Sequence, residues 1–223
     1  MSSTCLTSLP VYADNPSMSL ESPDAPSEPV GGERLLEDPL AIRAIAHPLR
    51  LDLLAAISRV RTMTTAEAAR ELGISHGLAS HHLRQLAKYG FVEQIDGKDH
   101  REHPWRTTAS AHRWPDEQSD PAAVAATDVL ERVLAKRVLD GFVRWQASRS
   151  EWSAEWLDGS GLATTALYLT PAELTSMTAE FEAMINRYTK DRTPATMADR
   201  PEGTALVDIA YFAAPSVKPT GRA

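Results

Sequence analysis

Two short helix-forming segments with a single glycine turn between them constrain the fold more than any other feature of this sequence. Residues 65–72 favour one helix, and residues 75–89 favour a second, with apolar side chains at helical spacing: Ala79, Leu83 and Leu86. Gly73 between them allows a tight turn. Residues 91–95 and 104–108 then have the composition of two strands joined by a polar turn. The pattern predicts a helix-turn-helix followed by a β-hairpin wing.

The chain before this unit divides near residue 38. Residues 1–37 contain five Pro and seven Ser, and their apolar residues have no fixed period, so we expect a disordered tail. From Leu40 to Ile57 the apolar spacing is helical, with a break or kink imposed by Pro48. The first folded element is therefore expected to start near Asp38, and residues 38–112 are interpreted as one winged helix-turn-helix domain.

Two further regions follow the wing. Residues 113–121 are interpreted as a linker, because the segment 115–121 is rich in Pro, Asp and Ser. Residues 122–158 favour helices whose apolar face is too wide for one neighbour. Burying this face against a second subunit is the simplest solution, so we expect dimerisation helices here.

The C-terminal region, residues 159–213, favours strand, helix and strand. The expected strands cover residues 162–169 and 204–212, and residues 214–223 are expected to form a disordered tail. The sequence thus predicts a mainly α fold with a small β component (α+β). Its parts are a winged helix-turn-helix domain, a long dimerisation helix and a small strand-helix-strand segment.

Charge is distributed unevenly along a chain whose formal net charge is −7. Residues 1–42 sum to −6 and residues 114–223 to −5, whereas residues 43–113 sum to +4 and contain all seven histidines. A basic segment between two acidic ones favours contact with phosphate. No Lys or Arg precedes Arg34, and no uncharged apolar stretch reaches about 18 residues. We therefore expect a cytoplasmic protein with no membrane partner.

The second helix of the pair has the side chains that reading DNA requires. A helix about 10–12 Å across fits a major groove about 12 Å wide, so short polar side chains near its N-terminus reach base edges. The candidates for contact with double-stranded DNA in this helix are Ser75, His76, Gly77, Ser80, His81, Arg84, Gln85 and Lys88. The apolar residues of the helix face the opposite way, into the core.

Three separated motifs occur here in an order typical of one family. The chain has Ala46-His47-Pro48-Leu49-Arg50-Leu51-Asp52-Leu53-Leu54, then Gly73-Ile74-Ser75 with Ser80-His81-His82-Leu83-Arg84-Gln85-Leu86, then Gly90-Phe91-Val92-Glu93. Over residues 38–112, about a third of the chain, it resembles ArsR-type bacterial winged-helix repressors. The resemblance implies a homodimeric transcriptional regulator that binds an operator and is released by an effector. The wing residues that would then face phosphate or the minor groove are Lys98, Arg101, His103 and Arg106.

The chain departs from the metal-sensing members of that family. Their recognition helix has a cysteine pair, whereas the only cysteine here is Cys5. Other members bind zinc through His and Asp of the dimerisation helix, yet residues 122–147 contain Asp128 and Asp140 but no histidine. We therefore expect no metal and no cofactor. Either a small organic effector binds in the C-terminal region, or the protein is controlled by its own abundance.

The two adjacent histidines of the second helix could suggest a zinc site. Neighbouring side chains on a helix point about 100° apart, so His81 and His82 cannot easily hold one ion. We expect His82 to pack partly against the core and His81 to face DNA. For Arg50, two interpretations stay open, a contact with phosphate and an ion pair with an acid on its own face.

A dimer of this kind makes a prediction about the operator. Two recognition helices related by a two-fold axis lie about 34–36 Å apart on one side of the duplex. The target is then an inverted repeat whose half-sites lie about 10 bp apart, or a multiple of that.

Two alternatives from other classes stay open. The winged helix could be a protein–protein interaction module in which the second helix docks a partner. A small enzyme built on residues 160–213 is disfavoured, because this region has no His, no Cys, no glycine-rich phosphate loop and no closely spaced acid–base set. The aromatic residues Phe142, Trp145, Trp152 and Trp156 favour core or dimer interface over a ligand pocket. We expect no catalytic residue.

Overall fold

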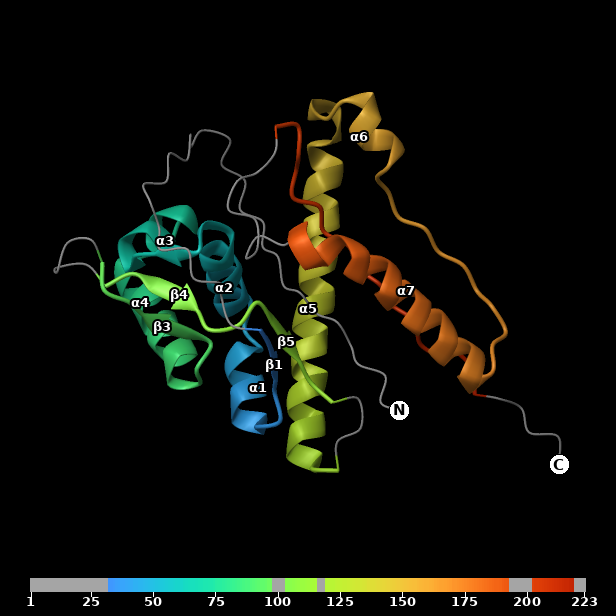
Figure 1. The fold of residues 1–223 in the computed structure, drawn as a ribbon, viewed down its shortest axis with the longest axis horizontal. Helices are drawn as coiled ribbons and strands as arrows, with labels where there is room; N and C mark the ends of the chain where they lie inside the picture. The colour runs from blue at the N-terminus through green and yellow to red at the C-terminus, as the bar shows by residue number, and fades with distance from the viewer. Residues whose placement is uncertain (1–31, 98–102, 116–118, 193–201, 219–223) are drawn as a thin grey trace.

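The computed structural model describes residues 32–97, 103–115, 119–192 and 202–218. Four short helices build the first half of the fold, and the first of them packs against one long helix, α5 (Figure 1). These four helices are α1 (Pro39–Ile45), α2 (Pro48–Val60), α3 (Thr65–Glu71) and α4 (His76–Lys88). The helix-turn-helix predicted from the glycine turn is α3 and α4. The break predicted at Pro48 separates α1 from α2 and is confirmed.

Local caps explain why these helices begin where they do. The Asp38 side chain accepts from Leu40 N at 2.9 Å and starts α1. Thr64 and Glu67 form a capping box at the start of α3, in which each side chain binds the other residue's backbone N–H. Ser75 accepts from Leu78 N at 3.2 Å and starts α4.

The predicted hairpin is present as part of a three-stranded antiparallel sheet. Strand β4 (Trp105–Thr107) lies between β3 (Val92–Gln94) and the short β2 (Thr62–Met63). Glu93 lies opposite Arg106 in the ladder. The turn expected at residues 96–98 reaches the edge of the described residues, since 98–102 lie outside them.

A second sheet, which the sequence did not predict, joins the N-terminal segment to the domain. Strand β1 (Glu33–Leu35) pairs in parallel with β5 (Ala111–Arg113). Leu36, next to β1, is 1% exposed, and its N–H donates to Arg113 O at 2.7 Å. The expectation of a disordered tail through residue 37 is therefore wrong for residues 33–37. The remainder of the expected tail, residues 1–31, lies outside the described residues.

One apolar core holds the domain together. It joins α1, α2, α4, β3 and the first turns of α5 through side chains that water barely reaches: Ile42, Ile45, Leu51, Leu53, Ile57, Leu83, Leu86, Phe91, Ala126 and Leu130. The carboxylate of Asp52 in α2 also pairs with Arg137 of α5. The long helix is therefore fixed to α1 by apolar contacts and to α2 by an ion pair.

The helices expected over residues 122–158 are confirmed. They are α5 (Pro121–Ala147), a 3₁₀ turn η1 (Arg149–Glu151) and α6 (Ala154–Asp158). The linker expected at 113–121 is shorter than predicted, because Arg113 ends β5 and Trp114 is 3% exposed against the core. None of the described helices is long and apolar enough to span a bilayer.

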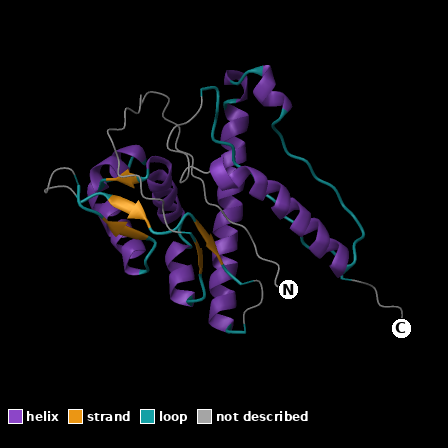
Figure 2. Ribbon diagram, in the orientation of Figure 1, coloured by secondary structure: helices purple, strands orange, loops and turns teal. Residues whose placement is uncertain are grey.

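Of the three elements predicted for the C-terminal region, the structure has the helix and lacks the two strands. Helix α7 (Pro171–Arg192) begins at a capping box between Thr170 and Glu173, whereas residues 162–169 and 204–212 form no strand (Figure 2). The prediction of two strands is wrong because an apolar segment forms a ladder only where a second backbone lies in register. These two segments do not pair with each other. The ring of Tyr211 stacks instead on Phe181 of α7 at 4.3 Å.

Candidate nucleic-acid interface

Helix α4 is divided into a buried face and an exposed face. Ala79, His82, Leu83 and Leu86 are buried. The residues predicted to contact DNA are exposed or half-buried: Ser75, His76, Gly77, Ser80, His81, Arg84, Gln85 and Lys88. His76, Ser80 and Arg84 lie four residues apart along one stripe, and Arg84 Nε donates to Ser80 O at 3.2 Å. One surface of the helix is thus polar and accessible along its whole length.

Leu78 is an exposed residue of α4 that the sequence analysis did not select. It lies beside the polar residues at the N-terminal end of the helix and is 42% exposed. The signal was available, since the core spacing of Ala79, Leu83 and Leu86 leaves Leu78 off the buried stripe. An apolar side chain at this place suits the methyl group of thymine.

The turn before α4 and the wing are both fixed to the helix pair. Gly73 has φ +62°, a conformation that glycine adopts without strain, and Ile74 N donates to Ala69 O at 2.9 Å. Trp105 of the wing donates from Nε1 to Thr65 Oγ1 of α3 at 3.0 Å. These contacts hold the turn, α3 and the wing in one frame.

The predicted wing residues have different surroundings. Arg106 lies on β4 and pairs across the ladder with Glu93, at 2.7 Å from Nη2 and 3.1 Å from Nε to the same carboxylate oxygen. Its charge is therefore partly compensated within the protein. His103 is exposed just before β4, and Lys98 and Arg101 lie outside the described residues.

The two adjacent histidines of α4 separate as predicted. His81 is exposed and His82 is 8% exposed, with its ring 4.7 Å from that of His47. Burial lowers the pKa of His82, and the neighbouring His47, His81 and Arg50 lower it further. Burial also lowers the pKa of His47, whose Nδ1 accepts from Leu49 N at 3.2 Å to cap α2. In the described part of the chain, no group of three or more His, Cys, Asp or Glu could hold a metal ion.

Arg50 lies beside this histidine pair. Among the described residues it forms no ion pair with an acid, and its Nε is buried without a hydrogen-bond partner. Burial lowers the pKa of the guanidinium. The structure thus shows no acid partner for Arg50, and its contact with phosphate stays a prediction.

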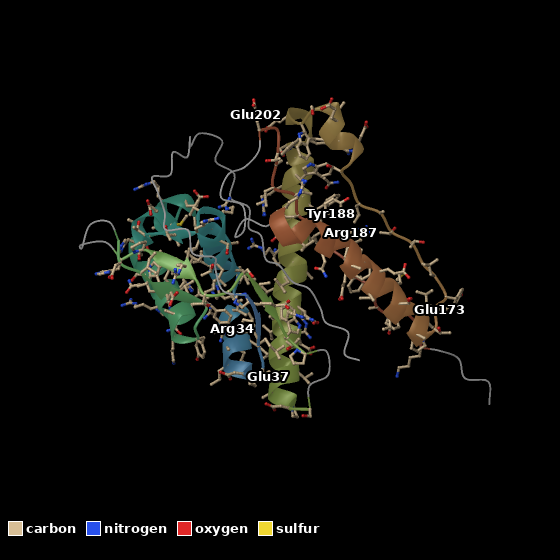
Figure 3. The ribbon with its side chains drawn as sticks, in the orientation of Figure 1. Arg34, Glu37, Glu173, Arg187, Tyr188 and Glu202 are labelled. Atoms are coloured by element: carbon tan, nitrogen blue, oxygen red, sulfur yellow. The ribbon has the colours of Figure 1, made fainter. Side chains whose placement is uncertain are left out.

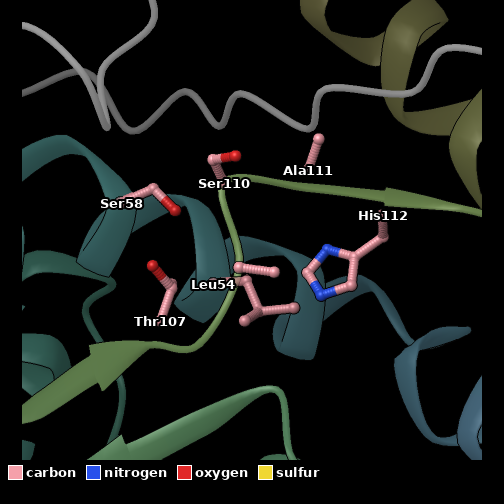
Figure 4. Close-up of a pocket in the computed structure, with 7 residues that line it drawn as sticks. Leu54, Ser58, Thr107, Ser110, Ala111 and His112 are labelled. Atoms are coloured by element: carbon pink, nitrogen blue, oxygen red, sulfur yellow. The ribbon is translucent and has the colours of Figure 1, made fainter. Parts of the chain in front are cut away.

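A small cavity lies between α2 and the segment that joins β4 to β5 (Figure 4). Its volume is about 20 Å³, and its lining includes Leu54, Thr107 and His112. Thr107 Oγ1 is buried without a hydrogen-bond partner. This space holds about one water molecule. It is far below the roughly 300 Å³ of the smallest ordinary ligand pockets, so it does not accommodate an organic effector.

The aromatic residues of the C-terminal half form two separate ring pairs. Phe142 and Trp145 lie 5.7 Å apart on α5, and Trp152 and Trp156 lie 6.0 Å apart around α6. All four are half-buried in the single chain. They are therefore not core of the isolated chain, and their place in a dimer interface stays a prediction.

Comparison with known protein families finds the helix-turn-helix. A family model described as a helix-turn-helix domain matches residues 45–95. No curated protein matches the chain. Among solved structures, apo MarR from E. coli is 15% identical with a TM-score of 0.28, and the match covers 66% of this chain and 87% of that one. The transcriptional regulator Tm0710 from Thermotoga maritima is 12% identical with a TM-score of 0.27, over 66% and 87% of the two chains.

At these identities and TM-scores the likenesses to solved structures do not bear on function. The helix pair, the glycine turn and the hairpin define the class of fold without them. The chain is a mostly helical α+β protein with a winged helix-turn-helix.

Proposed function

We propose that this chain is a sequence-specific DNA-binding regulator of transcription that acts as a homodimeric repressor of ArsR type. The observation that supports it best is the exposed face of α4. Eight residues expected to contact bases and phosphate, all but Gly77 of them polar, lie on the accessible side of a helix whose other side is buried. The basic balance of residues 43–113 adds the attraction to phosphate that such a helix needs.

Arg84 is the side chain on this face that can read a base most specifically. A guanidinium binds the O6 and N7 atoms of guanine with two hydrogen bonds, which discriminates by about 1–3 kcal/mol. We expect Arg84→Ala to weaken operator binding by about 10–100-fold and to relax the preference at one base pair. Titrations of labelled duplexes, measured by fluorescence anisotropy, check this.

Arg43→Ala is the matched control, because it removes an exposed arginine of α1, outside the face of α4. We expect its affinity to stay within twofold of wild type. Equal losses in the two variants would mean that only total charge matters, and would contradict base reading by Arg84.

The salt dependence of binding distinguishes DNA binding from the protein-docking alternative. Each phosphate contact makes the logarithm of the association constant fall with the logarithm of salt concentration by about 0.9. A docking surface for a protein lacks this steep dependence. Binding of operator DNA that falls by orders of magnitude between about 50 and 200 mM salt supports the proposal.

The second subunit of the proposed dimer is placed on α5. Val138, Leu139 and Val143 are 49%, 60% and 53% exposed on one side of this helix. Solvent-facing aliphatic side chains gathered along a helix are typical of an interface with a second copy. The Asp52–Arg137 ion pair and the apolar contacts of α1 then transmit the dimer geometry to the helix-turn-helix.

We expect Leu139→Glu to weaken dimerisation by about 100-fold or more, because the two-fold axis places the buried charge in the interface twice. Sedimentation velocity over a concentration series measures this. Ala122→Glu, at an exposed position in the first turn of α5, is the control and should leave the dimer intact. If the Leu139→Glu variant sediments like wild type, the dimer interface does not lie on this face of α5.

A further inference from the structure

The C-terminal end of the recognition helix is held by a residue outside the helix-turn-helix. Arg34 of β1 donates from Nη1 to Gly90 O at 2.6 Å and from Nη2 to Tyr89 O at 2.9 Å. Tyr89 is the C-cap of α4, and Gly90 follows it. Arg34 lies between α4 and α5 in the view of Figure 3. The two prongs of one guanidinium therefore bind two successive carbonyls at the end of α4.

The end of α4 is shaped to accept this guanidinium. Gly90 has φ +70°, and a Cβ added there would lie 3.4 Å from Arg34 Nη1. The guanidinium also lies over the Phe91 ring, with Cζ 4.9 Å from its centre. A cation at this place offsets the partial negative charge of a helix C-terminus. Gly90 O also accepts from Thr108 Oγ1 at 2.6 Å, whereas among the described side chains Arg34 is the one that donates to Tyr89 O.

Strand β1 is itself fixed to the other side of the domain. It pairs along β5, Glu33 forms an ion pair with Arg113 at 2.7 Å, and Leu36 is buried. Directly after β5, Trp114 reaches Glu131 of α5, with Nε1 3.4 Å from the carboxylate. Arg34 thus connects the end of α4 to a frame that includes the proposed dimerisation helix.

We propose that Arg34 is a positioning residue for DNA recognition. It fixes the orientation of α4 relative to β5 and α5, so that the two recognition helices of a dimer fit into successive major grooves. This inference rests on the proposed function and deepens it, since it adds a segment outside the 45–95 match to the DNA-recognition machinery. Arg34 acts through α4 and does not itself contact DNA.

The first test compares Arg34→Ala, Arg34→Lys and the control Arg43→Ala in the full chain. Charge-assisted hydrogen bonds are roughly twice as strong as neutral ones, so we expect Arg34→Ala to raise the operator dissociation constant about tenfold. Binding to random duplex should change by less than twofold, and the salt slope should stay as in wild type. Lysine keeps the charge without the two-pronged geometry and should restore only part of the affinity.

Three results of this test would overturn the proposal. One is equal loss on operator and random duplex together with a salt slope lower by about 0.9, which would make Arg34 a phosphate contact. Another is an operator affinity of Arg34→Ala within twofold of Arg43→Ala. The third is a loss of affinity that disappears when each protein is assayed at the same number of degrees below its own unfolding temperature. That result would show a role in stability alone.

The second test does not depend on DNA. Amide hydrogen exchange of the free protein reports how firmly the end of α4 is held. We expect exchange in the last turn of α4 and at Phe91 to be about tenfold faster in Arg34→Ala than in Arg43→Ala, with the first turn of α4 unchanged. Unchanged exchange would overturn the proposal even if the wild-type protein bound its operator. If wild type binds no DNA but exchange is faster in Arg34→Ala as expected, the proposed function is refuted, while the contact by which Arg34 holds the end of α4 is established.

Discussion

Replacing Phe91 by alanine is expected to lower the free energy of unfolding by about 3–5 kcal/mol. Its ring is fully buried and lies 5.1 Å from the ring of His112 and under the guanidinium of Arg34. Its N–H donates to Leu86 O at 2.9 Å, and its carbonyl accepts from Thr108 N at 3.1 Å. Phe91 therefore joins the recognition helix, the wing and the β1–β5 sheet, and its loss leaves a cavity where they meet.

Urea denaturation followed by circular dichroism measures this loss. Leu40→Ala is the control, because Leu40 is 58% exposed on α1 and its truncation should cost less than about 1 kcal/mol. Phe91→Leu keeps much of the volume and should fall between the two. If Phe91→Ala were no more destabilising than Leu40→Ala, the packing described around this ring would be wrong.

The second large effect is a loss of stability in acid that depends on His112. Burial lowers the pKa of His112 to about 4, with a further contribution from the positive charge of Arg34. In the unfolded chain the imidazole has its ordinary pKa of 6.5, so the unfolded state takes up the proton first as the pH falls. The stabilisation is complete above pH 6.5 and is lost between about pH 6.5 and 4. It amounts to about 3 kcal/mol.

Urea midpoints of wild type and His112→Gln, measured from pH 7.5 to pH 4, isolate this contribution. His47 and His82, whose pKa values are also lowered, act in the same direction in both proteins and cancel in the comparison. We expect the stability of wild type to fall more steeply with acid than that of His112→Gln. If stability falls equally with pH in both proteins, His112 is not a neutral, buried imidazole. His76→Gln is the control for loss of an exposed imidazole.

The elements that the sequence predicts correctly are those whose signals are local. The helix starts near Asp38, Thr65 and Ser75, the break at Pro48 and the turn at Gly73 depend on signals within a few residues, and each lies where the pattern indicated. The apolar spacing of α4 separates its buried from its exposed side in the same way. For this reason the location of the eight candidate residues on α4 could be predicted from the sequence.

The errors have a common physical origin in contacts between distant segments. Strand β1 forms because β5, nearly eighty residues later, offers it a parallel partner, and no local pattern in residues 33–35 indicates this. Conversely, residues 162–169 and 204–212 have the apolar composition of strands but lack a partner in register. The position of Arg34 at the end of α4 depends on the β1–β5 pairing and was therefore missed as well.

The Glu93–Arg106 pair is an intermediate case. The hairpin was predicted, and its register places these two residues directly opposite each other. Opposite charges at such positions attract, so the ion pair could have been inferred from the hairpin alone. Of the two predicted wing residues that the structure describes, Arg106 pairs with Glu93, whereas His103 is exposed.

Capture of sheared genomic DNA by the purified protein at about 150 mM salt tests the central claim most directly, since non-specific contacts are weak there. Sequencing should recover a small set of fragments that share an inverted repeat, with half-sites about 10 bp apart or a multiple of that. Arg84→Ala, treated identically, should lose this enrichment, and Arg43→Ala should keep it. Uniform recovery of the genome, or recovery of no DNA by wild type, would contradict sequence-specific DNA binding by this chain.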